Sequence, residues 1–306
     1  MMPGQDADYN CRICGQSNYT TLLSEYKTDS SGIYSLRRCN SCFFVSTFPF
    51  PNQDALSHQY DAAYWQEGSS SSRLLDLFYA LRSKGIINEL KGLVSNQGKI
   101  LDWGSGDCRW LKVIRDAGFK AWGIDLYSTM PHDQSVKNAT IETAGFSEAS
   151  FDAITAFHLL EHLPDPVGSI REALKILKPG GVMIVETPNI DSWGFRIFKK
   201  RWQPLQLPAH LNHFSPKTLR KIFENNGGVE IIKISHFSHR ASPAALVVSI
   251  FPGLEPRRVR GRRGGKYPDL YKIVYLFLQV LAYVFSGLEA AFGRGDIIRL
   301  YARKAQ

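Results

Sequence analysis

The middle of the chain alternates short apolar runs with amphipathic stretches. Four runs, at residues 99–103, 120–125, 151–157 and 181–186, have the composition of strands that are buried on both faces. Between them, residues 110–117 and 167–177 place apolar side chains at helical spacing. Strands that alternate with helices in this way form a parallel sheet with helices on both faces. The sequence therefore predicts an α/β fold built on a doubly wound sheet.

The regions on either side of this core have different patterns. Residues 1–50 are polar and rich in turns, with one strand candidate at residues 32–38. Apolar residues recur at helical spacing over residues 74–81, and Ser72 is placed to cap that helix. We therefore divide the chain into a small ribbon at 1–50, a helical linker or lid at 51–97, an α/β core at 98–236, an apolar and basic helical insertion at 237–293, and the last strand of the core sheet at 294–306.

The composition is that of a globular protein. Of 306 residues, 44% are hydrophobic and 21% are charged, which excludes a fibrous or disordered chain. No basic stretch leads into an apolar run near residue 1, so a secretory signal is not predicted. Five cysteines, four of them in two CxxC pairs, fit metal binding in a reducing compartment better than disulfide bonds. We therefore expect a cytoplasmic protein whose net charge of +9 allows contacts with anionic surfaces.

The four paired cysteines form the first candidate site. Cys11 and Cys14 make one pair, and Cys39 and Cys42 make the other. Two such tight turns place four thiolates at the corners of a tetrahedron, as in closed, structural Zn²⁺ sites. Four buried free cysteines are the less favoured alternative. A zinc ribbon can also contact nucleic acid, but no dense basic and aromatic surface lies beside it in the sequence, so nucleic acid is disfavoured as a partner.

A glycine-rich turn forms the second candidate site. It reads DWGSGDC, at residues 102–108, directly after the first core strand and directly before a helix. Its glycines allow a tight turn that a ligand can approach closely. Asp125 ends the next strand, where a carboxylate can accept both hydroxyls of a ribose. Arg109 stands where a dinucleotide-binding turn needs a third glycine, so the pattern favours a nucleoside-type ligand other than NAD.

Further motifs along the core complete a family pattern. The chain reads FDAI at residues 151–154, EHLPDP at 161–166 and LKPGG at 177–181. With the glycine-rich turn and Asp125, these motifs stand in the order found in class I S-adenosylmethionine-dependent methyltransferases. Over residues 99–188, the chain therefore resembles that family.

The resemblance implies a Rossmann-like, seven-stranded sheet whose last strand, at residues 296–301, runs antiparallel. It implies that the glycine-rich turn holds the methionine end of S-adenosylmethionine and that Asp125 holds the ribose. Leu126 would flank the adenine, and Phe157 and His158 would lie near the donated methyl group. The residues expected at the cofactor are thus Asp102, Gly104, Ser105, Gly106, Asp125, Leu126, Phe157 and His158.

The flanking segments resemble a narrower branch of the family. A four-cysteine ribbon ahead of the core and the segment LPAHLNHFS, at residues 207–215, are similar to methyltransferases of sugar and polysaccharide biosynthesis. Sugar C-methyltransferases carry a Glu-His pair at the corresponding place, whereas here Ala209 precedes His210. This difference argues against transfer to a carbon and leaves transfer to an oxygen or a nitrogen open. Of these two, we favour an oxygen of a nucleotide-linked or lipid-linked sugar.

Histidines are the candidates for the base that removes the acceptor proton, because their pKa lies near neutral pH. His210 is the first candidate and His162 the second, whereas His213 is expected to be structural. Glu161 and His162, with His158 one helical turn earlier, also resemble the acidic-histidine cluster with which ubiquinone-pathway O-methyltransferases bind a divalent metal. A capped, hydrogen-bonded turn beneath the cofactor explains His158 and His162 equally well.

The C-terminal third raises the question of a membrane. Residues 273–288 are almost entirely apolar, but sixteen residues are fewer than the ~20 needed to span a bilayer. A second apolar run at 244–251 precedes a basic segment at 257–266, and further cations interleave with aromatic residues at 193–202. Such a surface fits anionic headgroups on the inner face of the membrane. The alternative, which we favour slightly, is a substrate lid packed on the sheet, and the two can coexist.

Three functions stay open at this point. The sequence favours a zinc-containing O-methyltransferase that acts on a nucleotide-linked or lipid-linked sugar. A quinone-like or small aromatic acceptor would also suit the aromatic C-terminal third. The third hypothesis is a zinc-ribbon adaptor that binds nucleic acid and lacks catalytic function, but the intact glycine-rich turn and Asp125 argue against it.

Overall fold

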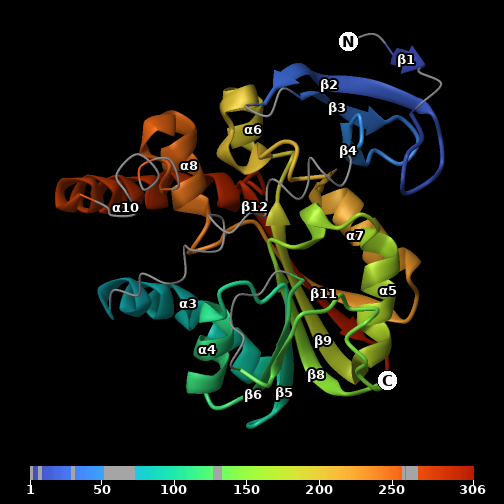
Figure 1. Cartoon of the computed structure of the whole chain (residues 1–306), viewed down its shortest axis with the longest axis vertical. Helices are drawn as coiled ribbons and strands as arrows, with labels where there is room; N and C mark the ends of the chain where they lie inside the picture. Colours follow the sequence, from blue (N-terminus) through green and yellow to red (C-terminus); the bar gives the residue numbers. More distant parts are fainter. Residues whose placement is uncertain are drawn as a thin grey trace.

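The computed structural model describes residues 3–5, 9–28, 32–51, 73–126, 133–256, 259 and 268–306. Ser72, the predicted helix cap, and the charged residues of the basic segment 257–266 lie outside the described residues. Figure 1 shows two sheets, of which the larger is covered by helices on both faces.

The larger sheet has seven strands in the order β11-β12-β9-β8-β5-β6-β7. Its central strands are parallel, and β12 lies antiparallel between β9 and β11. This arrangement confirms the predicted doubly wound sheet with an antiparallel last strand. The strands are β5 (Lys99–Trp103), β6 (Lys120–Ile124), β7 (Val136–Lys137), β8 (Phe151–Phe157), β9 (Leu177–Pro188), β11 (Val229–Ser235) and β12 (Ile297–Lys304).

Two groups of helices bury the two faces of this sheet. On one face, α3 (Arg73–Leu93) and α4 (Arg109–Asp116) pack against side chains such as Ile100 and Ile184. On the other face, α5 (Pro166–Ile176) and α7 (Pro216–Asn225) pack against Leu101 and Met183. Neighbouring residues of one strand thus face opposite helices, which is why these strands read as continuous apolar runs.

The smaller sheet joins the N-terminal region to the core. Its order is β1-β2-β3-β4-β10, formed by β1 (Pro3–Gln5), β2 (Asn18–Lys27), β3 (Ile33–Cys39), β4 (Val45–Phe48) and β10 (Asn212–His213). In the antiparallel pairing of β4 and β10, Asn212 lies opposite Ser46 and His213 lies opposite Val45. The predicted ribbon at residues 1–50 therefore takes its last strand from the segment that carries the candidate histidines.

A helical segment between β9 and β10 packs on this smaller sheet. It consists of α6 (Trp193–Phe198), η4 (Lys199–Arg201) and η5 (Gln203–Leu205). Trp202 and Leu205 are buried together with Leu36 of β3 and Val45 of β4. This separate apolar core fixes the segment that leads to His210.

A helical insertion separates β11 from β12, as predicted. It contains α8 (Ser242–Ile250), η6 (Pro252–Leu254) and α10 (Asp269–Ala291), and α10 packs against α8 at the side of the sheet (Figure 1). The prediction of a short apolar segment at 273–288 was wrong in length, because α10 has 23 residues. Glu289, which follows the apolar run in the sequence, belongs to α10, and its side chain is buried, with 8% exposed.

Candidate active site

The turn between β5 and α4 bends over the carboxyl end of β6, where the sequence predicts a nucleoside site. The N–H groups of Gly104 and Ser105 donate to the last carbonyl of β6 at 2.8 and 3.1 Å, and that of Gly106 donates to Oδ2 of Asp125 at 3.0 Å. Gly104 has a φ of +83°, and a Cβ atom there would lie 3.1 Å from Leu159. The close turn therefore needs glycine at this position.

A cavity of about 310 Å³ opens beside this turn. Most residues predicted at the cofactor line it, namely Asp102, the turn at residues 104–106, Phe157 and His158. Asp125 and Leu126 are not part of the lining, and Leu126 is 54% exposed. The lining consists of Tyr79, Asp102, Gly104, Ser105, Gly106, Asp107, Trp110, Phe157, His158, Glu186, Arg240 and Ala241.

Arg240 is a lining residue that the sequence analysis missed. Its guanidinium lies 5.0 to 5.3 Å from the ring centres of Tyr79, Trp110 and Phe157, and it donates a hydrogen bond to the hydroxyl of Tyr79. A cation held against aromatic rings in this way is oriented as well as stabilised. Arg240 comes from the loop before α8 and Tyr79 from α3, and no local pattern marks either residue as part of a site.

Asp102 and Ser105 are buried polar residues of the cavity lining. Asp102 is 2% exposed and accepts a hydrogen bond from the hydroxyl of Thr155 at 3.2 Å. Burial raises the pKa of Asp102 to about 7. The buried hydroxyl of Ser105 has no hydrogen-bond partner within the described part of the chain. A cationic ligand with hydrogen-bonding groups would satisfy both residues, so these residues fit the methionine end of S-adenosylmethionine.

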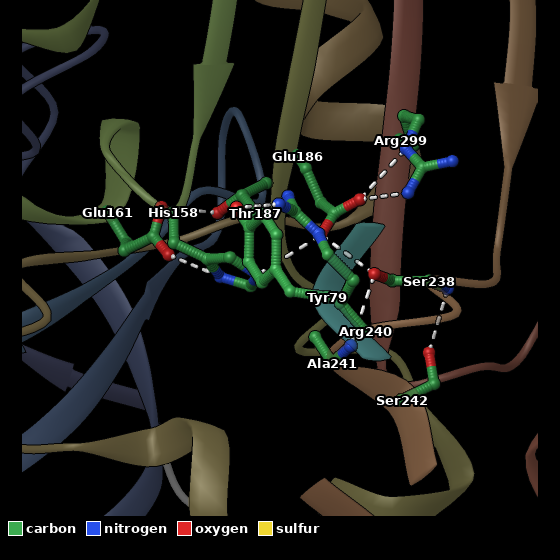
Figure 2. Close-up of polar contacts among 10 residues, drawn as sticks. All are labelled: Tyr79, His158, Glu161, Glu186, Thr187, Ser238, Arg240, Ala241, Ser242 and Arg299. Carbon is green, nitrogen blue, oxygen red and sulfur yellow. Dashed lines mark hydrogen bonds and ion pairs between the residues drawn. The ribbon is translucent and has the colours of Figure 1, made fainter. Parts of the chain in front are cut away.

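At the cavity wall, His158 is held between two buried carboxylates (Figure 2). Its Nδ1 lies 3.3 Å from Oε1 of Glu161, and its Nε2 lies 3.2 Å from Oε1 of Glu186. Glu186 also accepts hydrogen bonds from the hydroxyl of Ser238 at 2.9 Å and from Nε of Arg299 at 2.8 Å. Arg299 lies directly opposite Glu186 in the pairing of β12 with β9, so the sheet itself positions this ion pair.

The two carboxylates determine the charge of His158. Burial alone would lower its pKa, but the hydrogen bonds to Glu161 and Glu186 outweigh burial and raise the pKa to about 9. Burial would raise the pKa of Glu186, yet Arg299 and His158 hold it well below its usual value. His158 is thus cationic at neutral pH and is poorly suited to accept a proton. It matches the predicted hydrogen-bonded turn beneath the cofactor.

His162 and His210 form a pair behind His158. Their ring centres are 4.6 Å apart. Nδ1 of His162 lies 3.0 Å from the carbonyl of Ala209, and Nδ1 of His210 lies 2.8 Å from that of Pro204. Because a carbonyl only accepts, each Nδ1 donates, and each Nε2 is left with a lone pair while the ring is neutral. Burial, followed by the nearby His162, lowers the pKa of His210 well below its usual value.

Exposure and hydrogen bonding differ among His162, His210 and His213. His210 is only 3% exposed, whereas His162 is partly exposed, and neither lines the cavity beside the turn. His213 is 3% exposed, lies 3.1 Å from the hydroxyl of Thr47 through Nε2, and has its pKa lowered to about 3 by burial. His213 thus has the environment expected of a structural histidine.

Glu161, His162 and His210 also have the composition of a metal site. One possible ligand atom from each lies within 4.8 Å of the others. The Nδ1–H groups of both histidines donate to carbonyls, which is the usual arrangement for histidines that bind a metal through Nε2. Glu161, however, already accepts from Thr187 at 3.0 Å and contacts His158. The three side chains could hold a divalent cation only if the carboxylate of Glu161 bound the cation while keeping its contacts with Thr187 and His158.

The four paired cysteines come together as predicted. Sγ of Cys11 lies 3.4 Å from Sγ of Cys42, and Sγ of Cys14 lies 3.5 Å from Sγ of Cys39. All four sulfurs lie within 4.8 Å of one another. Tetrahedral Zn²⁺ with Zn–S bonds of about 2.3 Å requires sulfurs roughly 3.8 Å apart, so this cluster has the size and chemistry of a structural zinc site. It is remote in sequence from the cavity and offers no open coordination position.

Comparison with known proteins gives the same picture for the core. A sequence model described as a methyltransferase domain matches residues 72–229, about half of the chain. A structure of a SAM-dependent methyltransferase from Archaeoglobus fulgidus is 17% identical and has a TM-score of 0.48, covering 79% of this chain and 98% of that one.

Two curated relatives are named ubiquinone biosynthesis O-methyltransferase. The protein from Actinobacillus pleuropneumoniae is 34% identical over 146 residues, which cover 42% of this chain and 61% of the relative. The protein from Idiomarina loihiensis is 28% identical over 184 residues, which cover 53% of this chain and 73% of the relative. The chain therefore spans less than two thirds of the first relative's length.

Proposed function

Because the chain belongs to the methyltransferase domain family, as a class I S-adenosylmethionine-dependent methyltransferase, we propose that it methylates a hydroxyl group of a quinone-like aromatic acceptor. S-adenosylmethionine supplies a methyl group on a positively charged sulfur, which is already activated for transfer. The protein must hold this cofactor, align the acceptor hydroxyl with the methyl group and accept the hydroxyl proton.

The cavity and the turn provide the groups that would hold the cofactor. Asp102 and Ser105 would bind the methionine end, where the buried carboxylate attracts positive charge and the hydroxyl finds a partner. The guanidinium of Arg240, which also lines the cavity, would bind the carboxylate of the methionine group. Asp125, which accepts a hydrogen bond from the N–H of Gly106, would also accept hydrogen bonds from the ribose hydroxyls.

Cofactor binding is expected to strengthen as the pH rises from 6 to 7.5. Because the pKa of Asp102 is raised to about 7 by burial, most of the free protein holds this group neutral at pH 6. Binding a cationic ligand then requires loss of that proton, so affinity should be roughly five- to tenfold weaker at pH 6 than at pH 7.5. Calorimetric titration across this range measures the slope. Asp102→Asn should bind weakly with no such slope, and a wild-type affinity that does not change with pH would contradict the assignment.

The relatives support the quinone-like acceptor over the sugar favoured by the sequence reading. Both are named for ubiquinone biosynthesis and for transfer to oxygen. Oxygen transfer also agrees with Ala209, which stands where sugar C-methyltransferases carry glutamate. Membership in an enzyme family argues against the adaptor hypothesis.

The observation that carries the proposal is the close pair of histidines, His162 and His210, beside Glu161. A phenolic hydroxyl has a pKa of about 10, so a neutral imidazole can accept its proton as the methyl group is transferred. His162 is the better placed base, because it is partly exposed, whereas His210 is 3% exposed. We therefore reverse the predicted order: His162 accepts the proton, and His210 orients it through the ring contact of 4.6 Å.

A methyl-transfer assay tests both parts of this proposal. The purified protein is given labelled S-adenosylmethionine with either a polyprenylated catechol or nucleotide-linked sugars, and we expect transfer to the catechol. His162→Ala should lower kcat by about 10²–10⁴-fold without changing cofactor affinity, and His210→Ala should lower it less. Transfer to the sugars alone would overturn the acceptor class, and wild-type turnover of His162→Ala would remove His162 as the base. Added Mg²⁺ tests whether the histidine pair acts through a metal instead.

A further inference from the structure

Helix α10 turns its apolar side outward. Large hydrophobic side chains recur along one face at helical spacing and are well exposed: Leu270, Ile273, Phe277, Val284, Phe285 and Leu288 are each at least 54% exposed. On the opposite face, Gln279, Ser286 and Glu289 are each at most 8% exposed. A helix at a protein surface in water normally has the reverse arrangement. Exposed apolar patches of this kind mark sites of interaction with a membrane or with another protein.

The buried polar stripe fixes this orientation. Oε1 of Gln279 accepts a hydrogen bond from Arg82 of α3 at 2.6 Å. Tyr283, just beyond Gln279, forms a hydrogen bond with His239 in the loop before α8. Ala282 packs with Leu246 and Val247 of α8. These contacts run along the middle of α10, so rotation that hides the apolar face would break them.

Cationic residues precede α10 in the sequence and lie on the segment beside the end of α8. Between Pro256 and Pro268, where the chain enters α10, the sequence has six Arg and Lys residues and no acidic residue. A second group lies on η4, where Lys199, Lys200 and Arg201 are exposed. Arg201 donates a hydrogen bond to the carbonyl of Ile250 at 2.9 Å, which places it beside the exposed end of α8. The same region thus combines apolar area with positive charge.

We propose that α10 lies in the plane of an anionic lipid membrane, with its apolar face among the acyl chains and these cations at the headgroups. The apolar face suits the acyl chains of the membrane, and the cations suit its anionic headgroups. A second copy of this chain would bring a second set of the same cations to the patch, so charge argues against that occupant. The proposal goes beyond the proposed function and does not depend on the acceptor.

A position across the membrane does not agree with the contacts of α10. Residues Leu270–Ala291 are long and apolar enough to cross a bilayer by length and composition alone. A crossing helix would carry Gln279, Ser286 and Glu289 into the acyl chains and would separate Gln279 from Arg82. Lying in the plane keeps the polar stripe on the protein and only the apolar face in the lipid.

The proposed surface is connected to the active site through α8. The residues that precede this helix, Arg240 and Ala241, line the cavity, whereas Ile250 and Phe251 at its other end are 41% and 46% exposed. A nine-residue helix is about 13 Å long. An acceptor with an apolar chain in the membrane would therefore have its reactive head close to the cavity.

Vesicle co-sedimentation of the full chain tests the proposal. The protein is mixed with vesicles of phosphatidylcholine alone or with one third phosphatidylglycerol, at low and high salt. We expect binding to the anionic vesicles that weakens with salt. The double variant Phe277→Ser and Val284→Ser should bind at least about tenfold more weakly. The matched control, Ile33→Ser and Phe43→Ser, removes two side chains of 56% and 62% exposure from the N-terminal region and should bind like the wild type.

Other outcomes would overturn the proposal. Failure of the wild type to bind anionic vesicles at low salt would do so, as would equal binding to neutral vesicles. A dimer that the double variant dissociates, without vesicle binding, would assign the face to a second copy of the chain. Protein that resists alkaline extraction would indicate a crossing helix. Cofactor affinity and turnover of a water-soluble catechol should be unchanged in the double variant, so failure of the proposed function is detected separately.

Discussion

Asp125→Ala is expected to weaken the binding of S-adenosylmethionine by at least about a hundredfold while leaving the protein folded. The carboxylate of Asp125 accepts the N–H of Gly106 at 3.0 Å, and a carboxylate has two oxygens that can also accept hydrogen bonds from the ribose hydroxyls. Alanine removes both interactions at once. Loss of charge-assisted hydrogen bonds to two hydroxyls costs about 1.5–3 kcal/mol each, which corresponds to this change in affinity.

Calorimetric titration measures the effect, and two variants distinguish its causes. Asp125→Asn keeps one acceptor oxygen and the shape of the side chain, so its affinity should lie between those of the wild type and the alanine variant. Leu126→Ala tests the neighbouring residue, which is 54% exposed and expected to flank the adenine, and should change affinity by much less. Unchanged affinity in Asp125→Ala, with a normal thermal transition, would show that the ribose binds elsewhere.

We expect the cysteine cluster to hold zinc, and we expect loss of this zinc to unfold the smaller sheet. Cys39 is fully buried at the end of β3, and the cluster joins residues 11–14 to residues 39–42. Structural zinc sites contribute about 10–16 kcal/mol of apparent binding free energy, which is also folding free energy. We expect Cys39→Ser to purify without stoichiometric zinc and to lose the thermal transition of this sheet. Zinc content and circular dichroism measure both effects.

Unfolding of the smaller sheet should also disturb the histidines of the active site. The hydroxyl of Thr47 in β4 donates to the carbonyl of His210, and β4 pairs with β10. Turnover of Cys39→Ser should therefore fall more than its cofactor affinity, because the turn and the cavity belong to the other sheet. Cys108→Ser is a control for zinc content alone, because this buried cysteine lies outside the cluster but belongs to the glycine-rich turn. A zinc-free Cys39→Ser with wild-type stability would show that the cysteines have no structural role.

The sequence predicted the core well because its signals are local. The strands at 99–103 and 151–157 agree with β5 and β8 at both ends. β9 begins at Leu177, earlier than predicted, because Pro179 and Gly180 resemble a turn although the chain continues in the sheet. The glycine-rich turn and the cysteine pairs were found because each requires particular residues at a fixed spacing.

The residues that the sequence could not reveal are those brought in from a distance. Arg240 and Tyr79 are 161 positions apart and meet only because the insertion folds back over the cavity. The charge of His158 depends on Glu186, which lies in a buried strand and resembles any polar interruption of an apolar run. The polar stripe of α10 was visible in the sequence, but only the packing of α3 and α8 shows that it faces inward.

The position of β12 in the sheet sets an order of events during synthesis. In the sheet, β12 lies between β11 and β9 and pairs with both, and β12 follows α10 in the chain. A ribosome that adds about 5–20 residues per second thus releases the apolar helix before the strand that completes the sheet. For roughly 0.7–3 s at this rate, the nascent chain carries an exposed apolar helix beside an open strand edge. A chaperone that binds apolar helices or open strand edges would therefore meet this protein before its own fold is closed.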